Sequence, residues 1–243
     1  MDRILDMQLS GRLLFGRGAL AELPKALERL GVVRALIVTD RGLVRTGIPG
    51  EVATLLDSAG ISHATFDGVE PDPRVEIVEA CLQAARAFDC DGLIGVGGGS
   101  ALDIAKVTSV MLTNAGTALD YVGIDRIPFP GLPKVLIPTT AGTGSEVSPI
   151  AILSDADAHL KKGLVSPHLY ASLALVDPAL TASLPPHITA YTGIDALTHA
   201  IEAYTNRYAH PLIDTLALKA IALIGEYLPR AVARGDAVDA RTN

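Results

Sequence analysis

The sequence GLIGVGGGSALDIAKVTSVML, residues 92–112, decides the fold class of this chain. Residues 92–96 are apolar or glycine and predict a buried strand, while residues 101–112 place apolar side chains at helical spacing. Gly97, Gly98 and Gly99 lie between the two. A buried strand that leads through a glycine turn into a helix is typical of α/β proteins, and the free amides at the start of such a helix attract phosphate.

The same alternation extends along the chain on both sides of this stretch. Further buried strands are expected at 35–39, 134–138 and 173–177, and further helices at 19–30, 50–59 and 75–88. This order predicts a mostly parallel sheet covered by helices. Residues 150–166 differ, because two short apolar runs flank the polar residues 154–159, and they predict a hairpin laid on the edge of the sheet.

Strand patterns give way to helical ones after residue 184. Residues 187–205 and 212–234 each have a long helical pattern, and residues 236–243 resemble the first turns of a third helix without a C-cap. We therefore expect an α/β domain over 1–184 and an incomplete all-helical domain over 185–243.

Composition and charge narrow the function classes. The 243 residues carry a formal charge of -7 without a run of like charges, which argues against nucleic acid as a partner. No apolar segment reaches the roughly 18 uncharged residues that a bilayer span requires, and the first residues lack the basic and apolar regions of a secretory signal. We expect a cytoplasmic protein without a membrane partner.

Two features indicate a dinucleotide. Gly97, Gly98, Gly99 and Ser100 follow a strand, where consecutive amides and the helix dipole suit a pyrophosphate, although glycines there also serve close packing. Asp40 ends the strand at 35–39, where its carboxylate could accept both hydroxyls of an adenine ribose and repel a 2′-phosphate. This favours NAD over NADP. A plain turn residue explains Asp40 equally well.

Other polar residues have two interpretations each. Asp103, one turn into the helix at 101–112, suits either the helix dipole or a cofactor contact. The stretch PTTAGTGSEV, residues 138–147, supplies hydroxyls and glycines after another strand, as a strand cap or as a ligand loop. Asp195 and His199 stand four residues apart, so on a helix they could hold one cation or simply face solvent. Two ligands are fewer than the three protein ligands of a catalytic metal site.

These motifs resemble those of the iron-containing alcohol dehydrogenases, on residues 97–100, 138–147 and 193–204 in the same order and separation. The resemblance spans the sequence and implies a nucleotide-binding α/β domain of dehydroquinate synthase-like fold, followed by a helical metal-binding domain. It implies cofactor contacts from Asp40 at the adenine ribose, Gly98, Gly99 and Ser100 at the pyrophosphate, Thr139, Thr140, Thr143 and Ser148 on the nicotinamide side, and Lys161 at a ribose. Asp195 and His199 match the first two metal ligands.

The implied activity is NAD-dependent interconversion of a small alcohol and its aldehyde or ketone at Fe2+ or Zn2+. The sequence identifies neither the metal nor the alcohol, and it indicates no catalytic residue. It leaves open whether the protein forms a homo-oligomer. Maleylacetate reductases share the architecture without the metal ligands, so Asp195 and His199 disfavour them. The family's other two metal ligands are histidines further along, and this sequence ends before them. It therefore resembles a fragment of the family, and the alternative function is nucleotide binding without catalysis.

Overall fold

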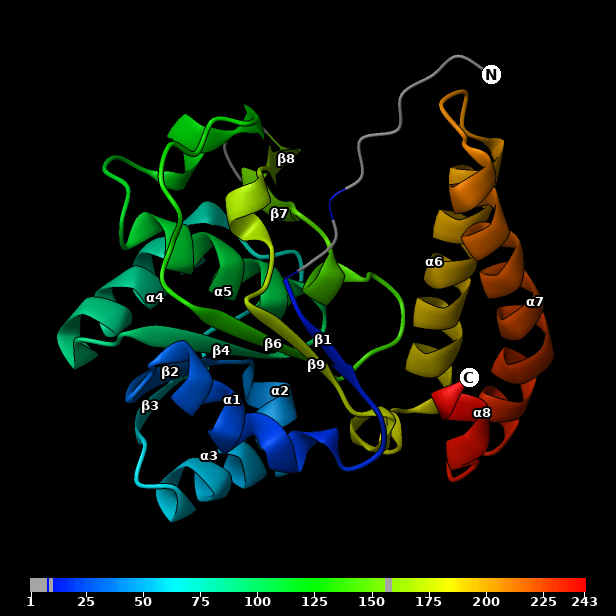
Figure 1. Cartoon of the computed structure of the whole chain (residues 1–243), viewed down its shortest axis with the longest axis horizontal. Helices are drawn as coiled ribbons and strands as arrows, with labels where there is room; N and C mark the ends of the chain where they lie inside the picture. Colours follow the sequence, from blue (N-terminus) through cyan, green and yellow to red (C-terminus); the bar gives the residue numbers. More distant parts are fainter. Residues whose placement is uncertain (1–7, 9–10, 156–158) are drawn as a thin grey trace. The chain divides into compact units, whose positions relative to one another are not determined.

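The computed structural model describes residues 8, 11–155 and 159–243, which form two compact units (Figure 1). The sheet unit consists of Leu9–Thr139 and Ser145–Asp177. The helical unit consists mainly of Thr140–Gly144 and Pro178–Asn243. The division therefore falls at Pro178, a few residues before the boundary expected at 185, and the short segment Thr140–Gly144 groups with the helices.

A parallel sheet forms the centre of the sheet unit. Its strands pair in the order β1-β9-β6-β4-β2-β3, and every pair among the described residues is parallel. The four strands expected from the sequence are confirmed, whereas the edge strands β1 and β3 were not predicted. The bounds are β1 (Leu13–Phe15), β2 (Arg34–Val38), β3 (Ser62–Phe66), β4 (Gly92–Gly97), β6 (Lys134–Pro138) and β9 (Leu173–Val176).

Helices cover both faces of this sheet (Figure 1). The helices α1 and α3 lie on one face, and α4 and α5 lie on the other. Every residue from Ala101 to Met111 of α5 is buried, so this helix is at the centre of the core rather than on its surface. The bounds are α1 (Leu23–Leu30), α2 (Arg41–Val44), α3 (Ile48–Ser58), α4 (Val75–Phe88) and α5 (Gly99–Met111), with short 3-10 helices at Ala19–Glu22, Ala118–Tyr121, Ser145–Val147 and Pro167–Leu169.

The expected hairpin exists, but it does not lie on the edge of the main sheet as predicted. The strands β7 (Ile150–Asp155) and β8 (Leu160–Val165) pair antiparallel, and β5 (Gly123–Ile124) pairs with β8 in a separate three-stranded sheet. Ala151, Leu153 and Leu164 point into the core. Packing of this face against α5, rather than hydrogen bonding to the edge of the main sheet, therefore holds the hairpin in place. Its polar tip, residues 156–158, lies outside the described residues.

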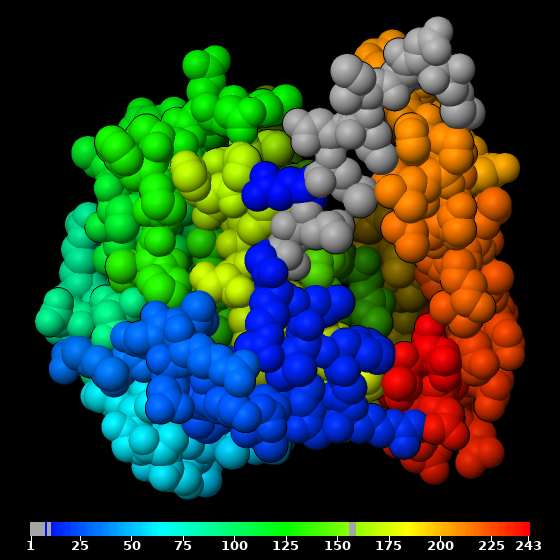
Figure 2. All heavy atoms as spheres, viewed as in Figure 1, coloured from blue at the N-terminus to red at the C-terminus, as the bar shows by residue number. Residues whose placement is uncertain are grey.

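The helical unit contains α6 (Pro186–Thr205), α7 (Pro211–Ala233) and α8 (Val238–Thr242), which confirms the helices expected after residue 185. Extensive contacts join α6 to α7, and α8 packs beside a 3-10 helix at Pro178–Thr181. Figure 2 shows α7 in orange as an open surface, on which Leu212, Leu216 and Leu218 are exposed. Within the described part of the chain, no helix combines the length and apolar character needed to cross a bilayer.

Candidate functional site

The carboxyl ends of β2 and β4 bring Asp40 and Gly97 together. In the parallel register Val38 lies opposite Gly95, so the residues two positions further along each strand also face each other. A Cβ built on Gly97 would stand 3.9 Å from Asp40 Oδ2. The chain leaves β2 toward β3 on one side and leaves β4 toward β6 on the other. This edge is therefore the point where the strand order reverses, where open α/β sheets bind their ligands.

The turn after β4 is shaped for an anion. Gly97 has a φ of 151°, and a Cβ there would lie 2.8 Å from the Cβ of Ala101, so glycine is required. The carbonyl of Gly98 accepts the amides of Ala101 and Leu102. The amides of Gly99 and Ser100, in the first turn of α5, have no intrahelical acceptor. A turn without side chains, with free amides at a helix N-terminus, fits a phosphate group.

Asp40 also has a structural role. Its Oδ1 accepts the amide of Leu43 at 2.9 Å and caps α2, which confirms the turn interpretation. The second oxygen, Oδ2, is the one that lies toward Gly97. Capping uses one oxygen and leaves the other at the strand edge, so the ribose contact stays a prediction compatible with this geometry.

The residues expected on the nicotinamide side fall in both units. Thr139 follows β6 and donates its amide to Gly97 O at 2.9 Å, and Ser148 belongs to the same sheet unit. Thr140 and Thr143 belong to the helical unit, in a segment whose Gly142 packs tightly against Thr192 of α6. The structure therefore places Thr139 and Ser148 in the unit that carries the glycine turn 97–99, here called the phosphate turn.

Lys161 lies on β8 opposite Ser154. Its ammonium pairs with Asp72 Oδ1 at 2.6 Å, and both side chains are largely exposed. An exposed ion pair stabilises a fold little, so this amine can leave Asp72 for an anionic ligand at small cost. Its ribose contact stays a prediction.

The carboxylate of Asp103 is directed into the protein. Its Oδ1 accepts the hydroxyl of Ser145, its Oδ2 accepts the amide of Ile152 at 3.0 Å, and Lys106 Nζ lies 3.4 Å from Oδ1. Both oxygens accept hydrogen bonds from protein donors. The geometry therefore gives Asp103 a role in holding the segment after β6, and the cofactor contact considered from the sequence stays a prediction.

Lys106 was missed by the sequence analysis. Its side chain is fully buried, and burial lowers the pKa of its ammonium while the neighbouring Asp103 carboxylate opposes that shift. Burial likewise raises the pKa of Glu146 in the adjoining 3-10 helix. A signal was available, because Lys106 is a lone cation whose neighbours Ile104, Ala105 and Val107 are apolar.

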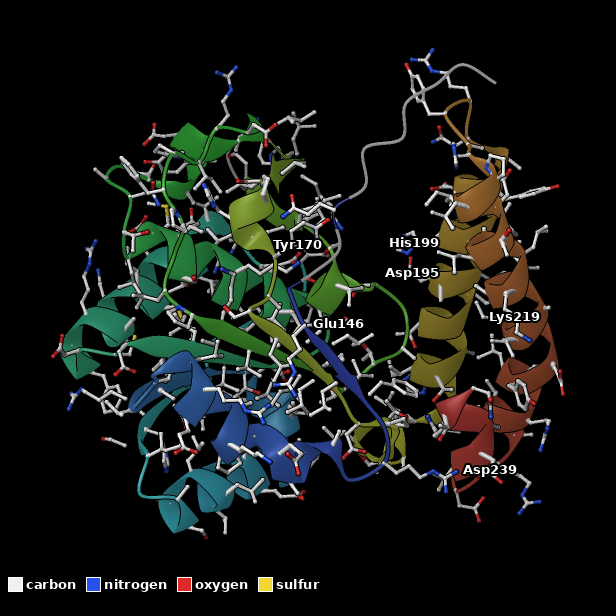
Figure 3. The ribbon with its side chains drawn as sticks, viewed as in Figure 1. Glu146, Tyr170, Asp195, His199, Lys219 and Asp239 are labelled. Atoms are coloured by element: carbon white, nitrogen blue, oxygen red, sulfur yellow. The ribbon has the colours of Figure 1, made fainter. Side chains whose placement is uncertain are left out.

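Asp195 and His199 project from successive turns on one side of α6 (Figure 3). The nearest atoms, His199 Nε2 and Asp195 Oδ1, are 3.8 Å apart, and the two side chains are 53% and 46% exposed. Two ligands of one tetrahedral zinc lie about 3.3 Å apart, given metal–ligand bonds of about 2 Å. Exposed side chains can close that difference by rotation, so the donor pair fits a divalent metal. The described residues contain no group of three or more His, Cys, Asp or Glu placed to bind one.

Comparison with known proteins matches both units. The family model "Iron-containing alcohol dehydrogenase" matches residues 10–178, and that of the C-terminal part of the Fe-containing alcohol dehydrogenase family matches residues 189–243. Alcohol dehydrogenase 4 of Schizosaccharomyces pombe is 42% identical over 230 residues, which are 95% of this chain and 54% of the relative.

Solved structures agree with these matches. A structure of 1,3-propanediol oxidoreductase superposes with a TM-score of 0.96 at 38% identity, over 99% of this chain and 63% of the other. A sulfoacetaldehyde reductase from Bifidobacterium kashiwanohense, solved in complex with NAD+, superposes with a TM-score of 0.92 at 34% identity, over 99% and 64%. The chain thus spans between half and two thirds of the length of these relatives. Since the family matches cover most of the sequence and both structural units, the chain belongs to the iron-containing alcohol dehydrogenase family.

Proposed function

We propose that the sheet unit binds NAD along the carboxyl edge of β2, β4 and β6. The observation that carries this proposal is the approach of Asp40 Oδ2 to Gly97, next to the first-turn amides of Gly99 and Ser100, which have no acceptor within the helix. A carboxylate beside a phosphate cradle suits the hydroxyls of an adenine ribose and repels a 2′-phosphate. NAD is therefore favoured over NADP.

The rest of the cofactor would follow the strand ends toward β6. Within the sheet unit, Thr139 and Ser148 would contact its nicotinamide side, and Lys161 would leave Asp72 to reach a ribose. The contacts of Thr140 and Thr143 are proposed from the family resemblance alone. Asp103 would act indirectly by holding Ser145. We assign no proton-transfer residue.

Asp195 and His199 would hold a divalent cation, Fe2+ or Zn2+, as two of its ligands. Bound NAD would supply a hydride acceptor and the metal would supply a Lewis acid for the alcohol oxygen, which supports interconversion of a small alcohol and its aldehyde or ketone. The family activity is therefore proposed for a protein in which further ligands complete this pair.

A second candidate function is NAD binding without catalysis by these 243 residues alone. The observation that favours it is the absence of a third metal-ligating side chain beside Asp195 and His199 in the described chain. A site with two ligands is short of the three that a catalytic metal needs.

One experiment separates these candidates. The 243-residue chain is titrated with NADH by fluorescence, and its metal content is measured after incubation with Fe2+ or Zn2+ and gel filtration. Saturable NADH binding together with one metal per chain, lost in His199→Ala, supports the metal-dependent enzyme. NADH binding without retained metal supports the second candidate. A folded chain that fails to bind NADH refutes both.

A further inference from the structure

We propose that Lys106 is a positioning residue for the nicotinamide side of the cofactor site. It would fix the segment 145–150 onto α5, the helix that begins at the phosphate turn. The proposal rests on the proposed NAD site, because it assigns a task to a residue outside the set expected to contact the cofactor.

The contacts of the buried ammonium define this task. Lys106 Nζ donates to Ser145 Oγ and to the carbonyl of Ile150, both at 2.7 Å, and it lies 3.5 Å from Ser148 Oγ. One cation therefore holds both ends of a six-residue segment that contains a proposed cofactor contact, Ser148.

The neighbouring Asp103 extends the same attachment. Its carboxylate accepts Ser145 Oγ and the amide of Ile152, and it lies beside Lys106 with an O–N distance of 3.4 Å. Two charged residues one turn apart on α5 thus hold the segment through charge-assisted hydrogen bonds, which are stronger than neutral ones.

Packing alone does not account for a charge at position 106. The side chain is fully buried, and taking an ammonium out of water carries a desolvation penalty that an apolar residue of similar size avoids. The ammonium instead fixes the position of the segment 145–150, because it contacts three of its oxygen atoms, Ser145 Oγ, Ser148 Oγ and Ile150 O. We infer that placement of this segment is its role.

The helix α5 links that segment to the phosphate turn. Gly99 begins the helix and Lys106 lies seven residues further along, a rise of about 10 Å. The proposed anion site lies at the N-terminus of α5, and the segment 145–150 is attached along the side of this helix. The rigid helix therefore sets the distance between the two halves of a dinucleotide. Loss of the attachment should therefore weaken the nicotinamide half and spare the half at the phosphate turn.

Lys134 provides a matched control. It is also a buried lysine, 4% exposed, and its ammonium donates to Ser109 Oγ at 3.2 Å and to His168 O at 2.9 Å. Neither acceptor lies in the segment 145–150. Removing this charge perturbs the same core without releasing the segment.

The test compares NADH with ADP, which carries the adenosine and the diphosphate but no nicotinamide. In Lys106→Met we expect the NADH dissociation constant to rise about tenfold, the effect of losing one hydrogen bond to a charged group, and the ADP constant to change less than about twofold. Lys134→Met should leave the ratio of the two constants at its wild-type value. Hydrogen exchange of the amides in 145–152 should quicken in Lys106→Met and stay unchanged in Lys134→Met.

A second variant covers the case in which Lys106→Met does not fold. Ser145→Ala keeps the Lys106–Asp103 pair and removes its hydroxyl partner, and it should raise the NADH constant selectively by about threefold to tenfold. Equal weakening of NADH and ADP, or an unchanged ratio in both variants, would overturn the role of Lys106 while the NAD site stands. Failure of the wild-type chain to bind either ligand would overturn the NAD site and this role with it.

Discussion

Lys134→Met should change the pH dependence of stability in a calculable way. Burial, with added repulsion from Lys106, lowers the pKa of Lys134 from 10.5 to about 8 in the folded protein. Folding with the ammonium charged is therefore penalised by about 3 kcal/mol at pH 7, from 1.36 kcal/mol per pKa unit. Between pH 8 and 10.5 the folded state releases this proton while the unfolded state keeps it. The contribution of Lys134 to stability therefore rises with pH through that window.

A methionine removes this titration. It also leaves His168 O without the ammonium, at a cost of about 1–3 kcal/mol that does not depend on pH. We expect the free energy of unfolding of Lys134→Met, relative to wild type, to fall by about 2 to 3 kcal/mol between pH 7 and pH 10. Burial raises the pKa of Cys81 to about 12, but Cys81 titrates in both proteins and cancels in the difference.

The assay is urea unfolding of both proteins at pH 7, 8, 9 and 10, followed by far-ultraviolet circular dichroism. A difference that stays constant within about 0.5 kcal/mol over this range would show that Lys134 has the same pKa in the folded and unfolded states, contrary to the prediction.

Three further predictions concern the helices and the cofactor edge. Gly193→Val should destabilise the α6–α7 pair by about 1–3 kcal/mol in thermal unfolding, because a Cβ at this position would clash with Leu228 Cδ1. Gly225→Ala should be neutral or stabilising, because a Cβ there meets no atom within 4 Å. Gly97→Ala should lower NADH affinity about tenfold in a fluorescence titration, because a Cβ would strain a backbone with φ 151°; unchanged affinity would contradict the phosphate cradle. Asp40→Ser keeps an N-cap for α2 but removes the negative charge. The ratio of NADPH affinity to NADH affinity, measured by isothermal titration calorimetry, should therefore rise about tenfold. An unchanged ratio would show that Asp40 does not face the ribose.

Buried strands and long helices could be predicted from the sequence, and edge strands could not. The strands β2, β4 and β6 each contain an apolar run and are buried almost throughout, so their pattern is visible locally. The edge strand β3 has the mixed sequence SHATF and contains no fully buried residue. The other edge strand, β1, is three residues long and exposes Leu13 and Phe15. Neither has the periodicity that identifies a strand.

The glycine turn between β4 and α5 was predictable because strand, glycines and helix adjoin one another in the sequence. The attachment through Lys106 was not, because its partners Ser145 and Ile150 lie about forty residues further along and no local pattern joins them. The location of the hairpin β7–β8 was mispredicted for the same reason. Pairing within the hairpin is local, but its location depends on distant segments, and its neighbouring strand β5 contributes only Gly123 and Ile124.

The most direct test of the central claim is a titration of the folded 243-residue chain with NADH, followed by competition with ADP. We predict saturable binding of one NADH per chain that ADP displaces and that Gly97→Ala weakens about tenfold, because the cofactor occupies the carboxyl edge of β2, β4 and β6. A folded wild-type chain that binds no NADH, or binds it with unchanged affinity in Gly97→Ala, would contradict the account.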